Sequence, residues 1–117
     1  MAWCCMTPRD RAALERIVEC VGVVDGYVQR AGPDWAEDDM AVDAIAKRIE
    51  EIGEAAKRIE LDTIGLMPEI DWRGLKGIRE VIAHDYDEVD LQILDDVVRN
   101  KLPQVAAVVG RILASGQ

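Results

Sequence analysis

The sequence predicts an all-α fold, an up-and-down bundle of four to five helices in one domain. Apolar residues recur every three or four positions along almost the whole chain, which is the period of an amphipathic helix. No segment shows the alternation of a strand, and there is neither an internal repeat nor a low-complexity tract. A chain of 117 residues is long enough to bury one core, so we expect a single domain at residues 7–117 after a disordered leader at residues 1–6.

Two long helices open the bundle. The first begins after Thr7, the expected N-cap, with Pro8 at its first position, and it continues until Gly32. The second covers about residues 38–59 and carries a narrow apolar stripe, which is typical of a helix that faces a bundle seam. Gly53 lies inside this second helix, where glycine lowers helix propensity. We therefore expect another backbone to approach it closely.

Shorter helices follow in the second half of the chain. Asp71 is the expected N-cap of a third helix. The apolar side of that helix consists of Trp72, Leu75, Ile78 and Ile82. Asp90 is the expected N-cap of a fourth helix, and Pro103 should kink or restart it, because proline has no N–H and clashes with the preceding turn. The apolar stripe then continues beyond Pro103 as far as Ile112.

Composition restricts the classes of function. The formal net charge of −9 argues against a broad basic surface, so any contact with nucleic acid must be local. The spacing of the three cysteines matches neither a disulfide framework nor a CxxC metal-binding motif. This favours a reducing cytoplasm. No apolar run is long enough to cross a membrane. With one histidine and no Cys/His cluster, we expect no metal and no other cofactor.

His84 is the only histidine, and the residues alone leave its role open. It could be a core residue, a cap at a helix C-terminus, a metal ligand, or one half of an acid/base pair. On an unbroken helix, at about 100° per residue, His84 would point roughly 140° away from Arg79, so one continuous helix cannot gather Arg79, His84 and Tyr86. The turn-prone sequence "DYDEVD" indicates that the helix ends near His84.

A two-fold dimer would give these residues a shared chemistry. Metal-free cleavage of RNA by its 2′-hydroxyl needs a base, an acid and a cation at phosphorus. One imidazole suits either proton role but not both at once, whereas a dimer supplies two copies of His84 and two of Arg79. The guanidinium would hold phosphate in a bidentate fork, and Tyr86 would orient the imidazole or donate to a phosphate oxygen.

The spacing Arg79-x4-His84-x-Tyr86 occurs between flanking segments that carry a family resemblance. "IGEAAKRI" and "PEIDWRGLKGIRE" precede the motif, and "VDLQILDDVVRNKLPQV" follows it. Together they closely resemble the HepT-like family of the HEPN superfamily over almost the whole chain after Met6. The resemblance implies a HEPN-like helical homodimer. It also implies the toxin of a type VII-like toxin–antitoxin pair, a metal-independent RNA endonuclease that acts on mRNA or tRNA.

The same resemblance implies roles for individual residues. Arg79, His84 and Tyr86 would be catalytic, and Tyr86 would also accept AMP from an MntA-like nucleotidyltransferase antitoxin. Arg73 and Lys76, about one helical turn apart, are the candidates for contacts with the RNA backbone. Two other hypotheses remain beside the nuclease. The chain would be a non-catalytic dimeric module that binds the nucleotidyltransferase, or chiefly a substrate for nucleotide transfer at Tyr86.

Overall fold

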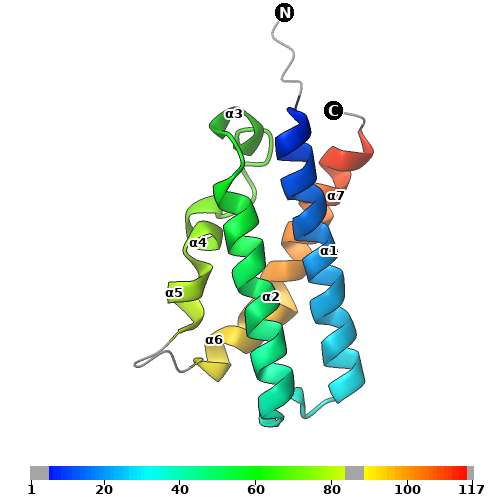
Figure 1. The fold of residues 1–117 in the computed structure, drawn as a ribbon, viewed down its shortest axis with the longest axis vertical. Helices are drawn as coiled ribbons and strands as arrows, with labels where there is room; N and C mark the ends of the chain where they lie inside the picture. The colour runs from blue at the N-terminus through cyan, green and yellow to red at the C-terminus, as the bar shows by residue number, and fades with distance from the viewer. Residues whose placement is uncertain (1–5, 84–88, 116–117) are drawn as a thin grey trace, which may run out of the picture.

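The fold is all-α, as the sequence predicts, and is described here from a computed structural model for residues 6–83 and 89–115. Two long helices, α1 (Pro8–Ala31) and α2 (Asp39–Lys57), run antiparallel and are joined through the short η1 (Trp35–Glu37) (Figure 1). The remaining elements are shorter. They are α3 (Leu61–Ile64), α4 (Trp72–Lys76), α5 (Ile78–Ile82), α6 (Leu91–Asp96), the π-helical η3 (Val97–Lys101) and α7 (Leu102–Ala114).

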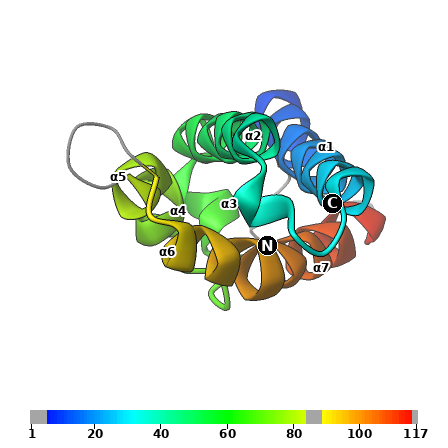
Figure 2. The ribbon, with the colours of Figure 1, turned by 90° about the horizontal axis from the view of Figure 1, so that it is seen from below.

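Seen along the long helices, the molecule has two layers. One layer is α1 beside α2, and the other contains α5, α6 and α7 (Figure 2). The core between the layers is made of aliphatic side chains from both, and its fully buried members include Leu14, Ile17, Ile45, Ile49, Ile52 and Val109. These residues lie on the apolar stripes that the sequence pattern predicts. Met6, which the expected boundary assigns to the leader, packs against this core, and residues 1–5 lie outside the described residues.

The predicted N-cap of α1 is confirmed, and α2 has an N-cap that the sequence pattern did not indicate. The Thr7 side chain accepts a hydrogen bond from Asp10 N, and Asp38 accepts from the first turn of α2. Gly32 follows α1 with a φ of 89°, a conformation that glycine adopts without strain. Trp35 and Trp72 are both buried, and Trp72 Nε1 donates to Met67 O at 3.0 Å, so both are packing residues.

A buried carboxylate that the sequence pattern did not indicate ties the start of α1 to the segment after α2. Asp10 is 1% exposed and accepts a 2.6 Å hydrogen bond from Thr63 Oγ1. It also accepts from the backbone N–H of Glu60 at 3.3 Å. A buried carboxylate is tolerated only when such donors surround it. Asp10 therefore fixes the position of the single-turn helix α3, an element that the apolar pattern did not predict.

The third predicted helix is wrong as a single element, because the structure divides it at Gly77. Glycines at positions 74 and 77 lower helix propensity within one turn, and Gly77 leaves the helical conformation with φ −101° and ψ 22°. Both short helices still bury the predicted apolar side chains against α2. The close approach expected at Gly53 is confirmed, since a Cβ there would lie 2.8 Å from Ile78 Cγ2 and 3.0 Å from Leu75 O.

The predicted kink at Pro103 takes the form of a π-helical segment. Pro103 lacks the N–H that would extend the hydrogen-bond ladder backwards, and the chain winds wider through η3 before it. Leu102 N consequently donates to Val97 O, five residues back. Pro103 itself falls in the first turn of α7, where its missing N–H costs nothing.

Candidate active site

The predicted site residues fall on α4, on α5 and after α5. Arg79 lies exposed on α5, and Arg73 and Lys76 lie on α4, so the break at Gly77 separates the two candidate RNA-binding residues from the motif arginine. The prediction that the helix ends near His84 is confirmed by its described flank, because α5 ends at Ile82. His84 and Tyr86 themselves lie outside the described residues.

The two flanks of the motif segment are held together. Ala83 is extended and forms an isolated antiparallel bridge with Val89. The backbone N–H of Asp90 donates to Ile82 O at 2.7 Å, and the Asp90 side chain caps α6 by accepting from Gln92 N and Ile93 N. The chain thus leaves α5 and returns to α6 at one place. Ala83 and Val89, the described residues on either side of the motif segment, therefore lie together at the C-terminus of the helix that carries Arg79.

A cavity of about 180 Å³ lies between α2 and the α4–α5 segment, next to Arg79. Its charged lining residues are Glu50, Glu54, Lys57, Lys76, Arg79 and Glu80. The structure therefore brings Lys76 together with Arg79, whereas Arg73 is not part of this lining. Glu54 and Lys57 come from α2 and were not predicted as site residues. The glycine at position 53 is the sequence signal for a close contact next to Glu54. The sequence does not show that Ile78 of α5 makes this contact.

Charges inside this cavity are coupled across the two helices. Lys57 Nζ donates to Glu54 Oε2 at 2.9 Å. This hydrogen bond holds the pKa of the Glu54 carboxyl below its usual value, and the nearby charges of Arg58 and Arg79 act in the same direction. The same bond raises the pKa of Lys57, with a further contribution from Glu80. The guanidinium of Arg79 makes no hydrogen bond to any residue in the described part of the chain.

This arrangement presents cations that can bind a phosphate group. An exposed guanidinium that no described residue engages in a hydrogen bond can form the bidentate fork that phosphate accepts. Lys76 adds a second cation on the same side of the cavity. The motif histidine lies outside the described residues. Within residues 6–83 and 89–115, no group of three His, Cys, Asp or Glu side chains is placed to hold a metal ion.

A second polar network joins α1 to α2 and has a structural role. Glu51 accepts from Arg48 at 3.1 Å and from Arg16 at 3.2 Å. Burial would raise the pKa of Glu51, but the two guanidiniums lower it below its usual value. Cys20 lies buried beside Glu51, and burial raises the pKa of its thiol. The network cross-links the long helices, and none of its members lines the cavity beside Arg79.

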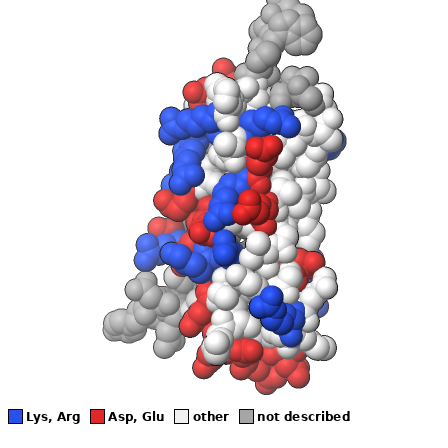
Figure 3. All heavy atoms as spheres, turned by 45° about the vertical axis from the view of Figure 1, so that its right-hand side comes forward, with Lys and Arg blue, Asp and Glu red and all other residues white. Residues whose placement is uncertain are grey.

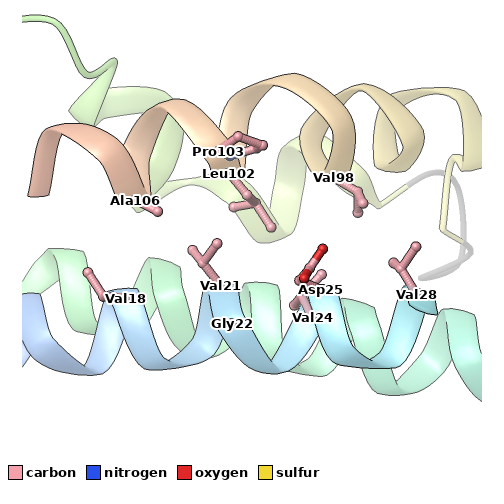
Figure 4. A pocket seen from close by; sticks show the side chains of 10 residues that line it. All are labelled: Val18, Val21, Gly22, Val24, Asp25, Val28, Val98, Leu102, Pro103 and Ala106. Carbon is pink, nitrogen blue, oxygen red and sulfur yellow. The ribbon is translucent and has the colours of Figure 1, made fainter. Parts of the chain in front are cut away.

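An apolar groove of about 370 Å³ lies between α1 and the η3–α7 junction, away from the motif arginine (Figure 4). Valines at positions 18, 21 and 28 of α1 face Val98 and Leu102 across it. Asp25 is the only titratable residue in its lining, so this groove contains no pair of groups for acid/base chemistry.

The distribution of charge on the surface agrees with a local contact for nucleic acid and not with a broad one. Figure 3 shows basic side chains interleaved with acidic ones over the face that it presents. Exposed carboxylates gather where η1 leads into α2, at Asp34, Glu37, Asp38 and Asp39. No helix in the described part of the chain is long and apolar enough to cross a membrane.

Comparison with known proteins identifies relatives of this chain. Residues 10–112 match a family model described as "Ribonuclease HepT-like". A protein of Thermococcus cleftensis named "Probable ribonuclease HepT" is 31% identical over 93 residues, covering 79% of this chain and 84% of that protein. A Methanocaldococcus jannaschii protein, provisionally named as an RNase, is 30% identical over 94 residues, covering 80% of this chain and 78% of its own.

A third relative matches over nearly the full length of both proteins. It is a protein of Caldanaerobacter subterraneus, also provisionally named as an RNase, which is 26% identical over 108 residues, covering 92% of this chain and 95% of its own. No solved structure matches the chain.

Proposed function

Because the chain belongs to the HepT-like ribonuclease family, we propose that it is the toxin of a toxin–antitoxin pair, an endonuclease that cuts mRNA or tRNA in the cytoplasm. One observation supports this most. The exposed Arg79 lies on the helix whose end is joined to the start of α6, so the segment with His84 and Tyr86 leaves and re-enters the fold beside it. We propose that Arg79 supplies the cation and that His84, two residues after the end of α5, supplies the titratable ring.

The proposed reaction is cleavage by the substrate's own 2′-hydroxyl. That oxygen attacks phosphorus, the bond to the 5′-oxygen breaks, and the products are a 2′,3′-cyclic phosphate and a free 5′-hydroxyl. One His84 accepts the proton of the attacking hydroxyl, and a second gives a proton to the leaving oxygen. Arg79 stabilises the negative charge that develops on the phosphate oxygens. No metal ion takes part in these steps.

The second imidazole is supplied by a symmetric homodimer. Exposed apolar side chains lie on both flanks of the motif segment, with Val81 at 42% exposed, Leu91 at 45% and Ile93 at 37%. Val81 and Ile93 also line a groove of about 300 Å³ between α5 and α6. Apolar side chains grouped in this way are suited to a protein interface. A second copy seated there would bring its own motif toward that of the first.

Neutralisation of the toxin is assigned to Tyr86. A nucleotidyltransferase partner, the antitoxin, transfers AMP from ATP to the phenol oxygen, so that an O–P bond forms and pyrophosphate leaves. The product carries a bulky anion next to the proposed phosphate-binding arginine. RNA is then excluded by steric overlap and by charge repulsion.

One observation favours a second function, a non-catalytic dimer that mainly binds this partner. Three carboxylates, Glu50, Glu54 and Glu80, line the cavity beside Arg79 and would repel RNA. The two functions differ in whether purified protein cuts RNA at all.

The test is cleavage of single-stranded RNA by purified wild-type protein and by His84→Ala, in buffer containing a chelator. We expect cyclic-phosphate ends from wild type and a loss of about 10²–10⁴ in rate for the variant. A wild type that leaves RNA intact but co-purifies with a nucleotidyltransferase would establish the binding module instead. Mass spectrometry after incubation with that partner and ATP should show added AMP, which is absent from Tyr86→Phe. An unchanged mass in wild type would refute the modification.

A further inference from the structure

We propose that Lys57 is a positioning residue, which holds the Glu54 carboxylate and thereby keeps the Arg79 guanidinium free for RNA phosphate. This inference rests on the proposed ribonuclease function and deepens it. It assigns to α2, a helix outside the motif, control over how well the motif arginine binds its ligand.

Backbone packing makes Glu54 a neighbour of the motif helix. Gly53 has no side chain, and Ile78 Cγ2 and Leu75 O occupy the space where its Cβ would lie. Glu54 directly follows Gly53, and Arg79 directly follows Ile78. Because this contact is made by the backbone of α2, Glu54 cannot move away from α5 without loss of the helix packing. Both charged side chains line the one cavity between these helices.

A carboxylate in that position competes with the substrate. Arginine binds carboxylate and phosphate with the same bidentate geometry, so Glu54 and an RNA phosphate would occupy the same face of the guanidinium. The structure shows Glu54 engaged elsewhere. Its Oε2 accepts from Lys57 Nζ at 2.9 Å, one turn along α2, and no described residue accepts a hydrogen bond from Arg79.

The size of the effect follows from the exposure of the pair. The Lys57 and Glu54 side chains are 53% and 63% exposed. Exposed ion pairs are weak and shift populations only severalfold, so Lys57 biases Glu54 and does not lock it. Loss of Lys57 leaves Arg79 and Lys76 as the cations that remain in the cavity lining. We therefore expect a partial loss of RNA binding, far smaller than the loss on removal of Arg79 itself.

The experiment measures kcat/KM for RNA cleavage and the Kd of a fluorescent single-stranded RNA for five variants. Lys57→Gln should lower kcat/KM and raise Kd, each by about 3- to 5-fold. Lys57→Arg should stay within about twofold of wild type, because it keeps the pair with Glu54. The double variant Lys57→Gln/Glu54→Gln should also return to within about twofold, because the competing carboxylate is gone.

Two matched controls separate this effect from charge alone. Lys57→Gln/Glu50→Gln makes the same change in local charge, since Glu50 lines the same cavity one turn away, and it should stay as weak as Lys57→Gln. Arg99→Gln removes a cation from the exposed pair with Asp95, which joins residues of α6 and η3 outside that cavity, and it should match wild type.

Each outcome decides the inference. Equal rescue by Glu50→Gln and Glu54→Gln would show that only local charge matters. No rescue by Glu54→Gln would show that Lys57 contacts RNA itself, and a Lys57→Gln variant equal to wild type would show no role. Any of these overturns the inference while the nuclease proposal stands. A wild type that binds but does not cut RNA overturns the nuclease proposal, and the Kd series still tests Lys57. A wild type that does neither overturns both.

Discussion

The α1–α2 pair and the segment from α4 to α6 differ in how their helices are built. The first is two long, capped helices that bury continuous aliphatic stripes and are cross-linked by Glu51. The second is three helices of five or six residues, interrupted at Gly77 and again between Ala83 and Val89. Short helices are marginal by themselves and depend on packing against a stable partner. The long pair thus serves as the scaffold, and the interrupted segment presents the candidate site.

If the long pair supplies most of the stability, its core substitutions should have the largest effect on folding. Ile49 is fully buried at the seam of α2, so Ile49→Ala should reduce the free energy of unfolding by about 3–4 kcal/mol through lost burial and a cavity. Met40 is 82% exposed, and Met40→Ala should change the free energy of unfolding by less than about 0.5 kcal/mol. Urea denaturation followed by circular dichroism measures both. Equal effects would remove the distinction between core and surface on α2.

The hydrogen bonds that Asp10 accepts are expected to make the next largest contribution to the free energy of unfolding. Asp10→Ala leaves Thr63 Oγ1 and Glu60 N without their acceptor in a buried place, so the free energy of unfolding should fall by about 2–3 kcal/mol. Hydrogen exchange should become faster in α3 while the centre of α2 stays protected. Unaltered exchange in α3 would show that Asp10 does not anchor it.

Two glycines within the long helices sharpen the comparison further. Gly53→Ala puts a methyl group into Ile78 and the Leu75 carbonyl, and it should destabilise the protein by about 1–2 kcal/mol while weakening the α2–α5 contact. Gly22→Ala meets nothing within 4 Å, and better helix propensity should stabilise by about 0.5–1 kcal/mol. Thermal melts of both variants give the signs. Two changes of the same sign would contradict the close approach at Gly53.

The smallest expected effect is the pH dependence of the Glu51 network. The pKa of Glu51 is lowered in the folded state, so its stabilisation is fully present above the unfolded value of 4.5 and disappears as pH falls through the folded pKa. Glu51→Gln should therefore cost at most about 1 kcal/mol at neutral pH. The difference from wild type should shrink as pH falls below 4.5. A difference that persists in acid would assign it to packing.

The sequence predicted the scaffold better than the site for a physical reason. In α1 and α2, the caps at Thr7 and Asp38 and the regular apolar period all favour one continuous helix in each segment. Between Asp71 and Ile82 the apolar spacing also continues, and it concealed the break at Gly77, since α4 and α5 each bury their own part of the stripe. The spacing of apolar residues shows which side chains are buried, but it does not show where one helix ends and the next begins.

Long-range electrostatics were likewise beyond sequence reasoning. Lys57 and Glu54 lie on what the sequence predicts to be an exposed helix face. The structure pairs Glu54 with Lys57, whereas i,i+4 spacing in the sequence predicts a pair of Glu54 with Arg58. That pairing was wrong, and the cavity beside Arg79 depends on a contact between residues 53 and 78 that no local pattern contains. The roles of Arg79, His84 and Tyr86 came from the family resemblance.

The most direct measurement is the rate of RNA cleavage by Arg79→Ala beside Arg111→Ala, both checked for an unchanged melt. Arg111 is an exposed arginine on α7 paired with Glu69, so its loss makes the same change in charge away from α4 and α5. We predict a loss of about 10²–10³ in kcat/KM for Arg79→Ala and less than about twofold for Arg111→Ala. Equal rates in the two variants would contradict the assignment of the site to the end of α5.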